Sequence, residues 1–134
     1  MLVLEKISLS FADFSLLKDN IVLIDYINEE PLNVEKGIQL VETINKISHG
    51  KPTAAIHNVG DKYIFTTDAL RFMGSQLTSE AHSYTARAIV ATNPAARIAT
   101  NNFINLYKPL IATKLFNEVD EALSWIEGLL AQGK

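Results

Sequence analysis

Short apolar segments alternate with helical patterns along most of the chain, and this alternation constrains the fold more than any other feature. The apolar segments cover residues 21–27, 53–58, 88–92 and 111–116. The first is a nearly continuous run, Ile-Val-Leu-Ile-Asp-Tyr-Ile, which indicates a central strand covered on both faces. Strands that alternate with helices predict right-handed crossovers and a mainly parallel sheet.

Three helices are predicted between and after these strands, over residues 33–48, 94–107 and 118–131. Asn33 and Asn117 are the expected N-caps of the first and last helices, and Asn93 followed by Pro94 marks the start of the second. The side chains expected to face the core are Val34, Ile38 and Val41, continued by Ile44 or Asn45 and Ile47 or Ser48, then Ala95, Ala99, Phe103 and Leu106, and finally Val119, Ala122, Leu123, Ile126, Leu129 and Leu130.

The beginning and the middle of the chain are less regular. Residues 2–9 predict a strand, and residues 10–17 either extend a hairpin arm or form a short irregular segment. Residues 61–85 predict two short helices, over 69–73 and 80–85, or one helix broken near Gly74 and Ser75. We therefore expect an α/β domain over residues 1–134, with a mainly parallel sheet of about five strands whose first strand is antiparallel.

Composition excludes several classes of protein. The chain has 134 residues and a net charge of -3, with no basic stripe of the kind that binds nucleic acid. It has no cysteine, so thiolate nucleophiles and thiolate metal sites are ruled out. No apolar run approaches the roughly 18 residues of a membrane span, and the N-terminus lacks the order of a signal peptide. A cytoplasmic protein without cofactors is the expectation.

No catalytic or nucleotide-binding pattern stands out. The glycines do not follow a Rossmann or Walker order, and no serine lies in a nucleophile elbow. The three histidines have no spacing typical of a metal site, so we expect none. The expected protein is therefore not an enzyme.

The carboxyl ends of the parallel strands are the expected place for a ligand or partner. His57 lies near such an end, although a buried, hydrogen-bonded core histidine is the commoner case. Arg97 is expected to contact an anion or a partner there, or to form a surface salt bridge. The predicted rim consists of Asp25, His57, Asn58, Thr66, Thr67, Asn93 and Arg97. An apolar lip of Phe65, Leu70, Phe72 and Met73 is expected beside it, with packing in the core as the alternative.

Several phrases of the sequence resemble a known family. These are the strand that starts at Ala88, the helix containing Asn101, Asn102 and Phe103, and the ending in which Lys114-Leu-Phe precedes Glu121-Ala-Leu-Ser-Trp-Ile. Together with the order of elements, they resemble the STAS fold of anti-sigma-factor antagonists, and more specifically the SpoIIAA-like or STAS/SEC14-like proteins of bacteria.

The resemblance implies a non-enzymatic regulatory or protein-interaction module, which binds a protein partner or a second copy of itself as a homodimer. The resemblance to SEC14-like proteins implies an alternative, a binding protein for a lipid or another apolar small molecule. STAS switch proteins carry a phosphorylated serine at the start of the helix after the third strand. Here Thr66 and Thr67 stand near that position, but the switch motif is absent, so the resemblance does not transfer phosphorylation.

Overall fold

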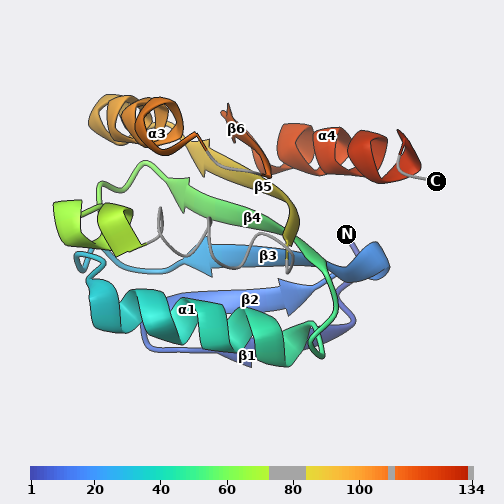
Figure 1. The fold of residues 1–134 in the computed structure, drawn as a ribbon. Helices are drawn as coiled ribbons and strands as arrows, with labels where there is room; N and C mark the ends of the chain where they lie inside the picture. The colour runs from blue at the N-terminus through green and yellow to red at the C-terminus, as the bar shows by residue number, and fades with distance from the viewer. Residues whose placement is uncertain (73–83, 109–110, 133–134) are drawn as a thin grey trace.

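A computed structural model describes residues 1–72, 84–108 and 111–132. Its centre is a six-stranded sheet in the order β1-β2-β3-β4-β5-β6, with helices on both faces (Figure 1). The strands are neighbours in the sheet in the same order as in the sequence, so each crossover connects adjacent strands. The predicted α/β class is confirmed.

The first half of the sheet is antiparallel. β1 (Glu5–Ser8) pairs with β2 (Ala12–Leu16), and β2 pairs with β3 (Ile21–Tyr26). The segment of residues 10–17 therefore contains the hairpin arm β2, which makes the sheet one strand larger than expected. The predicted turn before β3 is a short 3-10 helix, Lys18–Asn20, in which Asp19 and Asn20 have positive φ angles of 61° and 58°.

The second half of the sheet is parallel, as predicted. β3 pairs with β4 (Thr53–Gly60), β4 with β5 (Tyr84–Ala91), and β5 with β6 (Ala112–Phe116). β5 begins four residues before the predicted strand, which started at Ala88. The helix expected over 80–85 is thus wrong at its end, because Tyr84 and Thr85 belong to β5, and its residues 80–83 lie outside the described part of the chain.

Two of the helices begin directly after their predicted caps, Asn33 and Asn93, whereas the last begins two residues after its predicted cap, Asn117. α1 (Val34–Ile47) is capped by Asn33, whose side chain accepts a hydrogen bond from the Lys36 amide. α3 (Pro94–Tyr107) is capped by Asn93, which accepts from the amides of Ala95 and Ala96. α4 (Val119–Gln132) follows β6, and residues 67–72 are helical between β4 and β5. Within the described residues, no helix is long and apolar enough to cross a membrane.

Two apolar cores lie on opposite faces of the sheet. α1, α3 and residues 67–72 cover one face, where Leu40, Ile44, Ala69 and Ala96 pack against the strands. α4 covers the other face with Ala122 and Ile126, and its predicted apolar stripe is confirmed.

The core-facing sides of two helices differ from the prediction. In α1, Val34 and Ile38 are exposed and Leu40 is buried instead, whereas the predicted Ile44 and Ile47 are buried as expected. In α3, Ala95 and Leu106 are exposed, whereas Ala96, Thr100 and Phe103 are buried. Both helices carry apolar residues on more than one side, so the contact with the sheet selects the buried stripe and periodicity alone does not.

Candidate functional site

Three neighbouring strands place polar side chains on the sheet face that α1 covers. His57 of β4 lies opposite Ile24 of β3 and Ile89 of β5. Because side chains alternate between the two faces of a strand, Tyr26 and Arg87 point to the same face as His57. Tyr84, at the beginning of β5, belongs to the same core. The sheet therefore gathers two tyrosines, a histidine and an arginine beneath α1.

Tyr26 and His57 form a buried pair. The Tyr26 hydroxyl lies 2.8 Å from Nδ1 of His57, and both residues are buried. Burial lowers the pKa of His57 well below its ordinary value, and the nearby Arg87 charge lowers it further. Burial also raises the pKa of Tyr26, although Arg87 opposes this. His57 is therefore a neutral imidazole and Tyr26 a neutral phenol near pH 7.

Arg87 brings a positive charge into this interior. Its side chain is 5% exposed, and its Cζ atom lies 5.0 Å from the centre of the Tyr84 ring, a cation–π contact. Burial lowers the pKa of Arg87, but an arginine stays protonated in a protein. Among the described residues, no carboxylate lies within ion-pair distance of Arg87.

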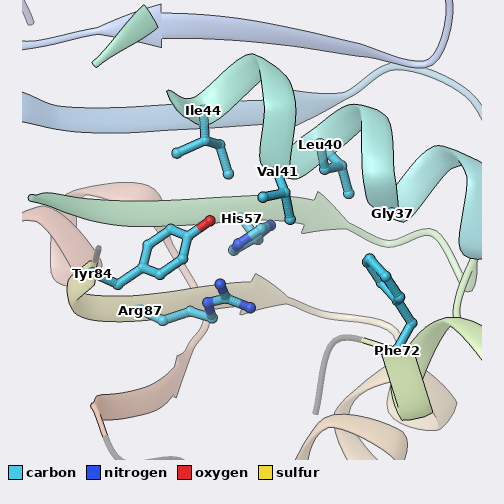
Figure 2. A pocket seen from close by; sticks show the side chains of 8 residues that line it. All are labelled: Gly37, Leu40, Val41, Ile44, His57, Phe72, Tyr84 and Arg87. Carbon is cyan, nitrogen blue, oxygen red and sulfur yellow. The ribbon is translucent and has the colours of Figure 1, made fainter. Parts of the chain in front are cut away.

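A small cavity separates this polar cluster from α1. It has a volume of about 20 Å³ and is lined by Gly37, Leu40, Val41, Ile44, His57, Phe72, Tyr84 and Arg87. Figure 2 shows His57, Tyr84 and Arg87 converging beneath α1, with Phe72 at the other end of the space below Gly37. The side-chain atoms Nε2 of His57 and Nε of Arg87 are buried here without a hydrogen-bond partner among the described residues. We call these lining residues the α1 pocket.

The structure separates the predicted rim residues into different environments. Asp25 and Asn58 form a pair, in which Nδ2 of Asn58 donates to Asp25 at 2.8 Å. They point to the opposite face of the sheet from His57, because each lies one position away from a residue of the α1 face. His57 itself lies inside the sheet, since β4 continues to Gly60. Asp25 and Asn58 therefore do not line one site with His57.

Three further rim residues hold loops in place. The Thr66 hydroxyl donates to the Leu32 carbonyl at 2.6 Å and accepts from the Ala69 amide, which caps residues 67–72. Asn93 caps α3 and donates to the carbonyl of Asp61 at 3.1 Å. Arg97 donates to the Ala91 carbonyl at 2.7 Å and to the Asn117 side chain at 2.8 Å, joining the ends of β5 and β6. Thr67 is exposed and lines a groove beside α3.

The predicted apolar lip consists mostly of residues packed against the interior. Phe65 packs against the core beneath α1, and Leu70 packs against Phe103 of α3. Phe72 lines the α1 pocket, where a Cβ atom added to Gly37 would lie 2.8 Å from Cδ1 of Phe72. Met73 lies outside the described residues.

Sequence reasoning missed two polar members of the α1 pocket, Tyr84 and Arg87, and also Tyr26, which contacts His57 from outside it. The missed signal is Arg87 itself, a charged residue inside the otherwise apolar run from Ala86 to Ala91, all of which is buried. The late predicted start of β5 left Arg87 outside the sheet. Among residues 1–72, 84–108 and 111–132, no group of three histidine, aspartate or glutamate side chains is placed to bind a metal ion.

The fold is that of the SpoIIAA-like class. This confirms the resemblance that the sequence suggested. The chain resembles the crystal structure of an uncharacterised protein of the DUF3478 family with a SpoIIAA-like fold, from Shewanella loihica PV-4. The TM-score is 0.60 at 14% sequence identity, over 85% of this chain and 90% of that one. At this identity the likeness establishes the fold alone.

The family follows from the sequence match. Residues 15–130 match the model of a family described as "Domain of unknown function (DUF7793)", and the chain belongs to that family. A comparison with curated protein sequences found no match.

Proposed function

We propose that this protein is a non-enzymatic, STAS-like interaction module that binds another protein through its strand-end rim. We define the strand-end rim as residues 27–33, residues 61–66 and Asn93. The observation that carries the proposal is the exposure of large apolar side chains on this rim. Ile27 and Tyr63 are each 50% exposed. Val34, the first residue of α1, directly follows the first rim segment and is also exposed. Exposed aromatic and aliphatic side chains are typical anchors of protein interfaces.

The rim loops are tied together by hydrogen bonds. The Leu32 amide donates to the Ile64 carbonyl at 2.7 Å, and Thr66 donates to the Leu32 carbonyl. Asn93 connects the end of β5 to Asp61. A surface already held in one conformation loses less entropy when it binds a partner, which favours docking.

The small internal cavity supports an interaction module over a carrier of apolar ligands. A lipid chain needs several hundred Å³, in the range of ordinary ligand pockets of about 300–1,000 Å³. The α1 pocket has about 20 Å³, which holds roughly one water molecule. A carrier role for this pocket would require the core beneath α1 to open widely.

Site-specific photo-crosslinking in cells of the source organism tests the proposal. A photoreactive amino acid replaces Tyr63 on the rim or, as the control, Ser124, which is exposed on α4. We expect a discrete protein adduct from position 63, which is lost in an Ile27→Ser variant, and no such adduct from position 124. Light scattering of the purified chain then shows whether it forms a dimer. A dimer that is lost in the Ile27→Ser variant would identify a second copy of the chain as the partner.

Two results would count against the rim. One is the same adduct pattern from positions 63 and 124, which indicates random collisions. The other is a lipid, too large for the α1 pocket, that remains bound to the purified chain in native mass spectrometry, which would favour the carrier instead.

A further inference from the structure

The α1 pocket contains a buried positive charge whose counter-charge is not among the described protein groups. Arg87 is only 5% exposed, and its Nε atom has no hydrogen-bond partner in the part of the chain that the structure describes. Removing a guanidinium from water is unfavourable unless an anion or several acceptors replace the water. The Tyr84 ring offers only a cation–π contact. The pocket is therefore electrostatically suited to an anion.

His57 adds a second donor to the same space. Nε2 of His57 is buried and has no hydrogen-bond partner within residues 1–72, 84–108 and 111–132, whereas Nδ1 contacts the Tyr26 hydroxyl. When Tyr26 donates to Nδ1, the proton of the neutral imidazole is on Nε2 and can be donated to a ligand. Arg87 and His57 line the same cavity, so both can reach one small anionic group.

The remaining walls are apolar. Leu40, Val41 and Ile44 from α1 and Phe72 from residues 67–72 line the cavity together with the polar side chains. A phosphate carries more charge and more acceptors than one arginine and one histidine can satisfy. A carboxylate has a single charge, which matches Arg87, and its apolar substituent would contact α1.

We propose that the α1 pocket binds a small organic monocarboxylate, whose carboxylate contacts Arg87 and His57 and whose short apolar group packs against Leu40, Val41 and Ile44. The proposal does not depend on the docking role of the strand-end rim. It concerns a small ligand because the cavity, at about 20 Å³, has room for little more than a water-sized group before side chains move.

Phe72 is placed to admit such a ligand. Its ring packs directly against the α1 backbone at Gly37, closing one end of the pocket. Phe72 also lines an open hollow on the outside, together with Val34, Asp68 and Arg71. Phe72 therefore lines both the pocket and the hollow.

Methyl NMR titration of the whole chain tests the proposal. The probes are benzoate and hexanoate, with benzamide as the neutral match of benzoate and inorganic phosphate as the match for charge. We expect saturable shifts of the Leu40, Val41 and Ile44 methyl groups with at least one of the two carboxylates. Benzamide should bind about tenfold or more weakly, because it lacks the charge-assisted bond to Arg87.

Variants locate the site. Arg87→Met should weaken carboxylate binding by about tenfold or more, whereas Lys114→Met, at an exposed lysine on β6, should leave it unchanged. Phe72→Ala should accelerate ligand exchange. The comparison of benzoate with benzamide uses the wild-type chain, so the test stands even where Arg87→Met does not fold.

The proposal is overturned if neither carboxylate gives saturable shifts at millimolar concentration, which would leave water as the occupant. Equal binding of benzoate and benzamide, or phosphate binding more tightly than either carboxylate, would overturn the ligand class.

Discussion

At the scale of single residues, His57 is held in a protonation state that the interior imposes. It is buried beside the positive charge of Arg87, and its pKa is lowered, mainly by burial. The Tyr26 hydroxyl contacts Nδ1 at 2.8 Å and orients the ring. The folded chain therefore keeps His57 neutral under conditions in which the unfolded chain protonates it.

This difference predicts that the free energy of unfolding falls as the pH is lowered below about 6.5, the ordinary pKa of histidine. There the unfolded chain binds a proton that the folded chain does not, so stability is lost by up to about 1.4 kcal/mol per pH unit and is fully present above that range. Urea denaturation between neutral and mildly acidic pH measures this dependence, and His57→Gln should reduce it.

His49→Gln is the matched control, because the His49 side chain is exposed and contacts only Glu5 among the described residues. It should keep the pH dependence of the wild type. An unchanged slope in His57→Gln would show that other groups cause the dependence.

At the scale of elements, α1 depends on a glycine for its approach to Phe72. A Cβ atom at Gly37 would lie 2.8 Å from Cδ1 of Phe72, closer than real contacts allow. At Gly128 in the middle of α4, an added Cβ atom would meet no other atom within 4 Å. The close contact with Phe72 therefore requires a glycine at position 37, whereas no contact requires one at position 128.

The two glycines predict opposite effects of substitution by alanine on the free energy of unfolding. Gly128→Ala should raise the free energy of unfolding by about 0.5–1 kcal/mol, because alanine is the better helix former. Gly37→Ala should lose this gain or destabilise the chain, because Phe72 must move. Urea denaturation measures both, and in a Phe72→Ala background Gly37→Ala should stabilise the chain as Gly128→Ala does. Equal stabilisation by the two single substitutions would contradict the close contact.

At the scale of the whole molecule, one sheet joins two cores. Ile44 of α1 is buried on one face, and Ile126 of α4 is buried on the other. The four parallel strands contribute side chains to both faces, so neither core can be lost without exposing the strands of the other. The chain is therefore expected to unfold as one unit.

Ile44→Ala and Ile126→Ala should each lower the free energy of unfolding by about 2–5 kcal/mol, with a single transition. Trp125 is the one tryptophan and packs against Phe116, so its fluorescence reports on the α4 face. Far-UV circular dichroism reports on the whole chain. Leu106→Ala, at an exposed position, should change little.

The two signals should give the same midpoint in each variant. A fluorescence transition that precedes the circular dichroism transition would show instead that the α4 face unfolds separately.

The sequence by itself determined the order of most elements and the starts of α1 and α3. Apolar runs of strand length, Asn33 and Asn93 as caps, and Pro94 at the first helical position act locally, so they are readable without the rest of the chain. The apolar stripe of α4 was equally readable, because its apolar residues follow a clear helical spacing.

Only the tertiary structure decided which polar residues meet. Tyr26, His57 and Arg87 are about thirty residues apart in sequence, and strand register brings them together. A register change of one residue would send each side chain to the other face, as the separation of His57 from Asn58 shows. The α1 pocket is therefore a product of pairing between distant strands, which no local pattern in the chain encodes.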